Sequence, residues 1–339
     1  MKNPLVSICI PIYNGELYLR ECLDSACSQD YLNVEIIIVD DQSTDNSIAI
    51  VNEYIQKDKR IKLFINEKNL GLVGNWNACI NKSSGEWIKY LFQDDTLIPT
   101  CVSRMMQFAT DDISIISCDR IFIFENGVAE DIKDEYKYKI LSPGKIFGIT
   151  KPALISSDKL CKMVIKYNTA NFIGEPNVLM FRKNLIDKFG YFDPLLYQIC
   201  DFEYCLRVSC NVGLFYIPEV LTSFRVHLNS TTASNKKANI ALLDSVLLNY
   251  QFIHSTYYKQ IQAQLSFLDL LKMKFILKLR LYEAQLWIKN SGEDHFYAKF
   301  QVSIKQIPDF SKYAMSPIVG CVFYSFILFR RRFLNLIIF

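Results

Sequence analysis

Two pairs of adjacent aspartates are the residues of this 339-residue sequence best placed to do chemistry. Asp94 and Asp95 follow one apolar run, and Asp40 and Asp41 end another. If both runs are parallel strands, the pairs lie where ligands of open α/β sheets bind, beyond the carboxyl ends of the strands. Carboxylates gathered there suit a hard divalent cation, Mg²⁺ or Mn²⁺, that holds substrate phosphates. The pairs therefore indicate an enzyme that handles a nucleotide diphosphate.

The first hundred residues alternate between β-rich runs and helical patterns, as such a site requires. The predicted strands are 5–12, 34–39, 61–65 and 87–92, and the predicted helices are 16–28, 46–57 and 74–82. This alternation predicts an α/β fold with a mostly parallel sheet and helices on both faces.

The order of elements changes after residue 100. We expect strands over 113–118 and 120–124 before Asn126-Gly127, a hairpin signal, and then a loop over 130–150. The other expected strands are 177–181 and 212–217. The expected helices are 100–109, 159–166, 183–189 and 201–208. From residue 231 to about 306 the pattern is almost entirely helical.

Charge and cysteine content restrict the class of protein. Residues 231–339 carry 14 Lys and Arg against 6 Asp and Glu, whereas residues 1–230 carry 24 against 29. A basic C-terminal part suggests contact with a membrane or a nucleic acid, and nothing resembles a nucleic-acid module. The 11 cysteines include no C-x-x-C pair, so we expect reduced, mostly buried thiols of a cytosolic protein. The N-terminus does not have the pattern of a signal peptide.

Several ordered motifs between residues 4 and 230 resemble the family 2 glycosyltransferases with the GT-A fold. They are Val6-Ser-Ile-Cys-Ile-Pro-Ile-Tyr-Asn, Glu21-Cys-Leu-Asp-Ser, Val39-Asp-Asp-Gln-Ser-Thr-Asp, Asn69-Leu-Gly, Gln93-Asp-Asp, Gly190-Tyr-Phe-Asp and Asp201-Phe-Glu. The resemblance implies a Rossmann-like catalytic domain over 1–230, with a nucleotide-binding half (1–99) and an acceptor-binding half (100–230). It also implies inverting transfer of a sugar from a nucleotide-sugar donor to an acceptor hydroxyl.

The resemblance assigns roles on the donor side. In the family's short acidic motif, Asp95 corresponds to the cation ligand and Asp94 to the residue that contacts the ribose. The residues that correspond to the nucleoside pocket and its closing loop are Pro11, Tyr13, Asn14, Asp40, Asp41, Asn69, Gly71 and Asn75. Asp41 would meet the base. Turn and cap chemistry alone also explains Asp40 and Asp41, and both roles can hold together.

On the acceptor side, Asp201 corresponds to the general base that inverting transfer requires. Cys200 replaces the first member of the usual acidic pair, which leaves the choice between Asp201 and Glu203 open. Gly174 and Glu175 resemble the segment that lines the acceptor. A pattern after the last core strand makes Arg225 a candidate for phosphate or acceptor binding and His227 a candidate metal or diphosphate ligand.

The C-terminal third combines apolar and basic residues. Residues 265–288 are mainly apolar with interspersed lysines, and the uncharged segment 313–329 precedes three arginines. That segment is short of the roughly 20 apolar residues of a membrane span. Basic residues among aromatics favour a position in the lipid interface, and the alternatives are a helical bundle or a dimer interface.

We therefore expect a metal-dependent, inverting glycosyltransferase of surface polysaccharide synthesis, peripheral on the cytoplasmic face of the cell membrane. A UDP-sugar is the favoured donor, a lipid-linked glycan the expected acceptor, and a homodimer remains open. The alternatives are a nucleotidyltransferase on a similar fold and a non-catalytic carbohydrate-binding relative. The first should carry a Gly-rich basic loop after the first strand, where Asn14-Gly-Glu-Leu stands. The second should have lost acidic residues that are present here.

Overall fold

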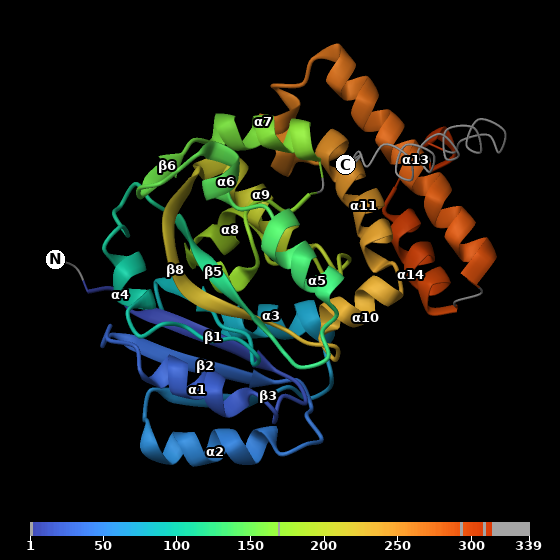
Figure 1. The fold of residues 1–339 in the computed structure, drawn as a ribbon. Helices are drawn as coiled ribbons and strands as arrows, with labels where there is room; N and C mark the ends of the chain where they lie inside the picture. Colours follow the sequence, from blue (N-terminus) through green and yellow to red (C-terminus); the bar gives the residue numbers. More distant parts are fainter. Residues whose placement is uncertain (1–2, 169, 292–293, 308–309, 314–339) are drawn as a thin grey trace.

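The computed structural model describes residues 3–168, 170–291, 294–307 and 310–313 (Figure 1). Its centre is an eight-stranded sheet of order β3-β2-β1-β4-β7-β5-β8-β6. The strands are β1 (Val6–Ile12), β2 (Val34–Asp40), β3 (Ile61–Ile65), β4 (Trp87–Tyr90), β5 (Ile115–Phe124), β6 (Ala153–Ile155), β7 (Leu179–Arg182) and β8 (Leu214–Val226).

The first four strands form the predicted parallel half of the sheet. Every residue of β1, β2 and β4 is buried, because helices cover both faces and leave no polar side to the strands. Those helices are α1 (Leu19–Cys27), α2 (Ser47–Lys57) and α3 (Gly71–Lys82). All are close to their predicted positions: α1 begins three residues after its predicted start at residue 16, and α3 begins three residues before its predicted start at residue 74.

The second half of the sheet contains antiparallel pairs, since β7 lies antiparallel between β4 and β5. The two strands predicted over 113–124 are wrong: β5 is one strand with register shifts next to Asp119, and it pairs with β8 along both parts. Asn126 and Gly127 form a turn, with Gly127 at φ 88°. The predicted loop that follows is instead mainly helical, with α5 (Glu130–Asp134), the π-helix η1 (Glu135–Lys139) and α6 (Pro143–Phe147).

The remaining helices before the end of β8 pack beside this sheet. They are α4 (Cys101–Met106), α7 (Ser157–Tyr167), the 3₁₀ helix η2 (Pro176–Val178), α8 (Leu185–Phe189) and α9 (Cys200–Val212). One helix and one strand are longer than predicted. Helix α9 extends to Val212, and strand β8 extends to Val226, nine residues beyond its predicted end. This extension carries the end of β8 to the edge where β4 ends.

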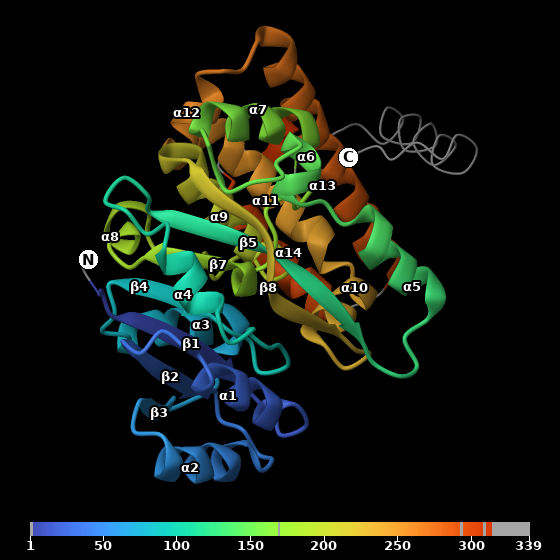
Figure 2. The ribbon, with the colours of Figure 1, turned by 60° about the vertical axis from the view of Figure 1, so that its left-hand side comes forward.

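The chain after β8 is helical, as predicted, and it lies against the flank of the sheet domain (Figures 1 and 2). Its helices are α10 (Thr231–Lys237), α11 (Ile240–His254), α12 (Lys259–Gln262), α13 (Phe267–Ser291) and α14 (Asp294–Lys305). Helix α11 buries apolar residues on two sides: one side enters the main core through Leu248 and Phe252, and the other packs on α13 and α14 through Leu243.

Two further sequence expectations can be compared with the described residues. The cysteines among them are all free, and all but Cys27 are buried, as expected. None of the helices in the described part of the chain is both long and apolar enough to cross a membrane. The segment 313–329 and the three arginines after it lie outside the described residues, apart from Tyr313.

Candidate active site

Both aspartate pairs lie at the same edge of the sheet, because β2, β1 and β4 are parallel neighbours. The loop after β1 connects the two pairs. Gln93, which precedes Asp94, accepts a hydrogen bond from the Tyr13 backbone N–H (2.8 Å) and donates one to the Tyr13 carbonyl oxygen (3.1 Å). Gly15 fits here because a Cβ on it would lie 2.4 Å from Gln93 Oε1. The edge is therefore a connected set of loops that carries the predicted donor residues.

Asp41 is buried and its carboxylate holds the loop before α3. Oδ1 accepts hydrogen bonds from Asn66 Nδ2 and the Leu70 backbone N–H (both 2.8 Å), and Oδ2 accepts one from the Gly71 N–H (2.9 Å). Asn69 Nδ2 donates to the Asp41 carbonyl oxygen (2.9 Å). Gly71 has φ 73°, a left-handed conformation that glycine tolerates well. These bonds satisfy free N–H groups at the start of α3, which explains its early beginning.

Other predicted donor residues also brace this edge. Asn75 is buried and donates from Nδ2 to the carbonyl oxygens of Ile12 (3.2 Å) and Val39 (3.1 Å), the ends of two strands. Asp40 accepts a bond from the Ser43 N–H (3.0 Å) through Oδ2, while its buried Oδ1 has no hydrogen-bond partner in the described structure.

The residues predicted for the nucleoside pocket in the first strand and its loop differ in exposure. Pro11 is buried in β1, whereas Tyr13 is 48% exposed and lies directly after the strand. Asn14 has φ 47° and accepts a hydrogen bond from the Thr44 N–H (2.8 Å), so it joins the loops that follow β1 and β2. Tyr13 and Asn14 are therefore exposed at this edge, whereas Pro11 is buried.

Asp94 and His227 face each other at the end of β4 and β8. His227 Nε2 lies 3.0 Å from Asp94 Oδ2, and the two side chains are 14% and 25% exposed. The ring of Tyr18 lies 5.1 Å from that of His227, centroid to centroid. The pair thus brings one carboxylate and one imidazole, partly open to solvent, to the edge where the donor residues gather.

Asp95 points inward instead. It is 2% exposed, and its two carboxylate oxygens accept hydrogen bonds from Asn177 Nδ2 (2.8 Å) and the Arg225 backbone N–H (2.7 Å). Burial, and next the neighbouring Asp94 charge, raise the pKa of Asp95 well above its ordinary value. Asp94 is therefore the accessible member of the pair, and the assignment of the cation to Asp95 and of the ribose to Asp94 stays a prediction.

Arg225 does not present a free guanidinium group to a phosphate or an acceptor. Its Nε donates to the Asp94 carbonyl oxygen (2.9 Å), and its two terminal nitrogens pair with Glu21 and Glu125. The guanidinium carbon lies 4.6 Å from the centre of the Tyr18 ring. The buried Arg225 side chain therefore braces the Asp94 backbone, which differs from its predicted role in binding the acceptor.

Of the predicted acceptor-side residues, Glu175 is held by an ion pair. It pairs with Arg120 (Oε2 to Nε, 2.6 Å). Gly174, at φ 115°, leaves room for this pair because a Cβ there would lie 3.2 Å from Arg120 Nη1.

Asp201 is the accessible acidic residue at the start of α9. It is partly exposed, and desolvation raises its pKa to about 7, against a smaller lowering by the hydrogen bond from the Phe202 N–H. Glu203 is not brought into the site. It is 2% exposed, forms an ion pair with Arg207 (Oε1 to Nε, 2.8 Å) and accepts a bond from the Tyr258 hydroxyl (2.6 Å). Of the two candidate bases, the geometry favours Asp201.

The sequence analysis missed Asp244, which holds the start of α9. This residue of α11 is 2% exposed, and its Oδ2 accepts hydrogen bonds from the backbone N–H groups of Tyr197 (2.9 Å), Gln198 and Ile199 (3.0 Å). Burial raises the pKa of Asp244 to about 6. The signal in the sequence was a single acidic residue within an apolar helix.

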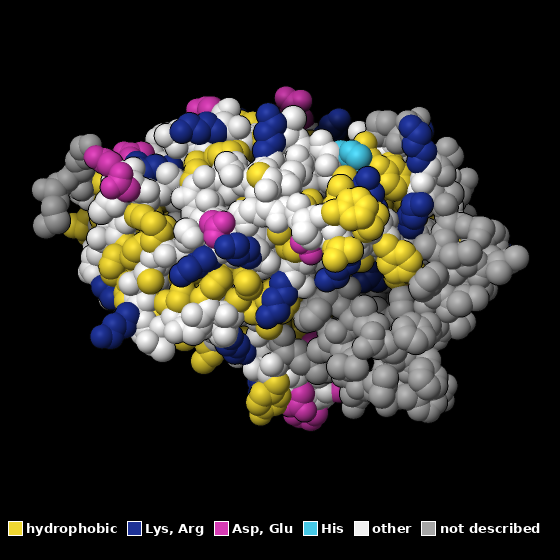
Figure 3. Space-filling view, turned by 90° about the horizontal axis from the view of Figure 1, so that it is seen from above, with side chains coloured by type: hydrophobic (Ala, Val, Ile, Leu, Met, Phe, Trp, Pro, Cys, Tyr) yellow, Lys and Arg dark blue, Asp and Glu magenta, His cyan; other side chains and the backbone are white. Residues whose placement is uncertain are grey.

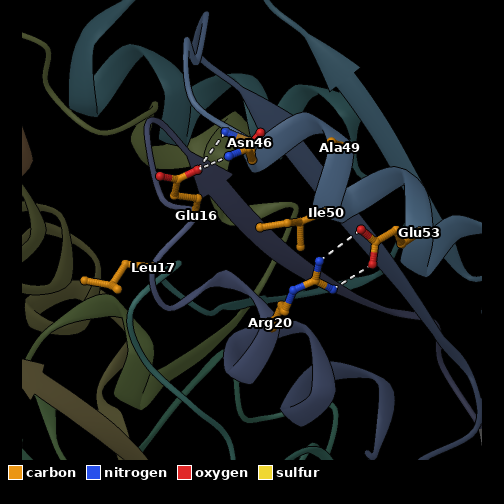
Figure 4. Close-up of a pocket in the computed structure, with 7 residues that line it drawn as sticks. All are labelled: Glu16, Leu17, Arg20, Asn46, Ala49, Ile50 and Glu53. Atoms are coloured by element: carbon orange, nitrogen blue, oxygen red, sulfur yellow. Dashed lines mark hydrogen bonds and ion pairs between the residues drawn. The ribbon is translucent and has the colours of Figure 1, made fainter.

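A hollow of about 540 Å³ lies away from these residues, between α1 and α2 (Figure 4). Its polar walls are internally paired: Arg20 forms two bonds with Glu53 (2.7 and 2.9 Å), and Glu16 accepts from Asn46 Nδ2 (2.7 Å). None of the predicted site residues lines it. We therefore place the candidate active site at the strand edge and not in this hollow.

Solved glycosyltransferases share this fold. Residues 1–349 of TarS from S. aureus, solved with UDP-GlcNAc, align with a TM-score of 0.58 and 16% identity over 88% of this chain and 79% of TarS 1–349. The mannosyltransferase PcManGT from Pyrobaculum calidifontis, solved with GDP-Man and Mn²⁺, aligns with a TM-score of 0.56 and 15% identity over 90% of this chain and 81% of its own. The protein has the predicted GT-A fold.

The sequence identifies the family. The model of glycosyl transferase family 2 matches residues 7–181, and the chain belongs to that family. It is 30% identical over 239 residues to the uncharacterized protein MT1568 of Mycobacterium tuberculosis. This alignment covers 70% of this chain and 71% of MT1568. It is 34% identical over 160 residues to the putative glycosyltransferase EpsH of Bacillus subtilis, which covers 44% of this chain and 46% of EpsH.

Proposed function

We propose that this protein transfers a sugar, with inversion, from a nucleotide-diphosphate sugar to a hydroxyl group of a glycan acceptor. The observation that carries the proposal is that two separate groups suited to different steps of the reaction lie near the ends of the strands. The accessible Asp94–His227 pair lies at the end of β4 and β8, and Asp201, with its pKa raised to about 7, lies at the start of α9. The Asp94–His227 pair is suited to binding the diphosphate, and Asp201 is suited to accepting a proton from the acceptor hydroxyl.

Asp94 and His227 would hold the divalent cation, with Mg²⁺ or Mn²⁺ as the candidates. Oxygen and imidazole donors are both ligands of Mn²⁺, and the pair is partly exposed. The described residues contain no group of three His, Cys, Asp or Glu side chains that could hold a metal. Two protein ligands plus substrate phosphates are a usual arrangement for Mg²⁺. A bound cation would neutralise the charge that develops on the leaving diphosphate.

The protein groups around this pair orient the donor and the cation ligand. Tyr13 is accessible for stacking on the base, and Asp41 keeps the loop at Asn69 and Gly71 in place beside it. Arg225 Nε donates to the Asp94 carbonyl oxygen (2.9 Å), and the Asp95 carboxylate accepts a hydrogen bond from the Arg225 backbone N–H (2.7 Å). We assign them positioning roles and assign the direct contacts to Asp94 and His227.

Asp201 would take the proton from the acceptor hydroxyl as that oxygen attacks the sugar carbon. A base with a pKa near 7 is half-deprotonated at neutral pH and accepts a proton more strongly than an ordinary aspartate. The Glu175–Arg120 pair would offer hydrogen-bonding groups to the acceptor sugar. Glu203 has no free carboxylate oxygen for this role. Arg207 bonds to both of its oxygens, and the Tyr258 hydroxyl also donates to Oε1.

The acceptor class and location extend the proposal. A lipid-linked glycan of surface polysaccharide synthesis, met at the cytoplasmic face of the cell membrane, agrees with the basic C-terminal part. A UDP-sugar is the favoured donor. TarS was solved with UDP-GlcNAc and PcManGT with GDP-Man and Mn²⁺, which makes uridine and guanosine diphosphate sugars the first to try.

A panel of nucleotide sugars, each with and without Mn²⁺, tests the proposal by thermal unfolding. A donor that binds only the native state raises the melting temperature, and the shift should require the cation. Transfer to a lipid-linked acceptor then establishes the reaction, and the anomeric configuration of the product establishes inversion. No stabilisation by any nucleotide sugar, or a product of retained configuration, would contradict the proposal.

A further inference from the structure

The first turns of α13 expose an apolar surface that the core does not use. Phe267 and Leu268 are each 74% exposed and Leu271 is 48% exposed. We call these three residues the α13 stripe. Figure 3 views the molecule from the end where α13 begins, and hydrophobic side chains gather there beside lysine and arginine side chains. Single exposed apolar residues are ordinary, whereas a contiguous group indicates a contact surface.

Helix geometry shows that the exposure belongs to this end of α13 alone. Leu268, Leu271 and Phe275 lie on one face, since residues three and four apart are neighbours on a helix. Farther along the same face, Leu279 and Tyr282 are each 7% exposed. The same line of apolar residues is therefore buried in the middle of α13 and presented to the outside at its start.

Lysines border the α13 stripe on both sides. At 100° per residue, Lys272 falls on one flank of the α13 stripe, Lys274 falls on the other, and Lys278 lies in line with the stripe two turns after Leu271. Residues 255–280 carry five lysine or arginine residues and one acidic residue, Asp269. That carboxylate accepts a bond from the Ser266 hydroxyl (2.6 Å) at the start of the helix, so it is engaged locally. The surroundings of the stripe are basic.

We propose that the α13 stripe is the surface by which the protein lies on an anionic lipid membrane. The inference rests on the proposed function, because a lipid-linked acceptor requires the enzyme to work at such a surface. Apolar side chains flanked by lysines bind the interface of a bilayer, where the chains enter the acyl boundary and the lysines meet anionic headgroups. A second copy placed on the stripe by two-fold symmetry would instead bring the same lysines against each other.

Co-sedimentation of the full chain with vesicles tests the surface directly. The test variant is Phe267→Ser/Leu268→Ser/Leu271→Ser. Its matched control is Leu32→Ser/Leu154→Ser, which removes side chains that are 82% and 55% exposed outside the helical region. On vesicles that contain phosphatidylglycerol, we expect the partition coefficient of the test variant to fall at least tenfold and that of the control to stay within about twofold of wild type. Equal binding of test variant and wild type would overturn the proposal.

A charge variant separates the basic flanks from the apolar stripe. Lys272→Gln/Lys274→Gln/Lys278→Gln should lose most of the preference for anionic over phosphatidylcholine vesicles, and its binding should depend less on salt. If this variant keeps the full preference for anionic vesicles, the basic flanks do not face the lipid and the proposal fails.

A depth measurement identifies the occupant of the stripe. Leu271→Trp adds a fluorophore at the stripe, and lipids brominated in their acyl chains should quench its added emission. The proposal is overturned if that emission is not quenched, whether residues 314–339 cover the stripe or light scattering shows a dimer that the serine variant abolishes. Donor-induced thermal stabilisation, measured in parallel, tests the proposed function separately: a protein that binds donor but not vesicles refutes only the membrane surface.

Discussion

The two aspartate pairs have the same sequence pattern and nearly the same place in the fold, yet their surroundings differ. In the pair at the end of β2, both residues are buried. The Asp41 carboxylate accepts three hydrogen bonds from Asn66, Leu70 and Gly71. In the pair after β4, Asp95 is buried in the same way, but Asp94 is 25% exposed and faces His227. An acidic pair at a strand end therefore marks the site, and the environment of each carboxylate decides its role.

The largest expected effect is a difference in turnover between variants of the two aspartate pairs. Asp94→Asn should lower kcat about 10³-fold or more with little change in melting temperature, because the variant loses a charged ligand that supports several kcal/mol of transition-state stabilisation. Asp41→Asn should lower kcat less than about tenfold and act mainly on stability and donor KM. Steady-state transfer assays beside thermal melts measure both. The distinction between the pairs fails if the two variants lose turnover equally.

The two acidic residues of α9 provide the second contrast. Asp201→Asn is nearly isosteric and should lower kcat by about 10²–10⁴, the usual range for a general base, while donor binding is retained. Glu203→Gln should leave kcat within about tenfold but destabilise the fold by roughly 3–5 kcal/mol, because it leaves Arg207 as a buried unpaired charge. Denaturant unfolding and single-turnover rates separate the effects. A large kinetic loss in Glu203→Gln alone would exchange the two roles.

Asp244 should affect the rate indirectly. Asp244→Asn weakens the cap that fixes residues 197–199, and a misplaced base can cost up to about 10²-fold in rate. We expect a lower kcat, an unchanged KM for donor and a shifted pH profile. A purely structural role would lower the melting temperature without moving the pH profile.

The pH dependence follows from the raised pKa of Asp201. Transfer should rise with pH up to about 7, where the carboxyl group releases its proton. Stability should run the other way: between its ordinary 3.8 and about 7, the folded protein holds a proton that the unfolded chain has released. The stabilising contribution is thus complete below about pH 4 and lost as pH rises through 7. Asp201→Asn should remove the contribution of this residue to both trends, and the difference between wild type and variant isolates that contribution. A wild-type rate that is flat from pH 5 to 8 would contradict this assignment.

The smallest expected effect concerns the cap at α3. Asp41→Ala removes the acceptor of the Leu70 and Gly71 N–H groups, and loss of a helix cap typically costs about 0.5–2 kcal/mol. Thermal unfolding of this variant should show that loss. The matched change Asp30→Ala, at an acidic residue outside the site, should show less; an equal loss would mean that the cap contributes little.

The parallel half of the fold could be predicted closely because each strand there is a buried apolar run with its own turn signal. The region from 113 to 150 could not. Asp119 and Arg120 interrupt the apolar pattern of β5, and only the long pairing with β8, a segment about a hundred residues away, makes it one strand. Contacts of this kind leave no periodic signal in the local sequence.

The location of the site was predictable for the same reason, and several of the individual roles were not. The motif placed Asp94 and Asp95 together, but which of them faces outward depends on Asn177 and Arg225, both remote in sequence. Arg225 had the residue type of a phosphate ligand, and only its pairing with Glu21 and Glu125 assigns it to bracing. Asp244 carried no motif at all, since its role depends on the contact of α11 with the backbone of residues 197–199.

Manganese binding tests the central claim most directly. Electron paramagnetic resonance follows free Mn²⁺ during titration into the protein with UDP, for wild type, Asp94→Asn and Asp95→Asn. We predict UDP-dependent binding by wild type, a loss of at least about tenfold in affinity for Asp94→Asn, and a smaller loss for the folded fraction of Asp95→Asn. Wild-type affinity in Asp94→Asn, together with lost binding in Asp95→Asn, would contradict the account and return the metal to Asp95.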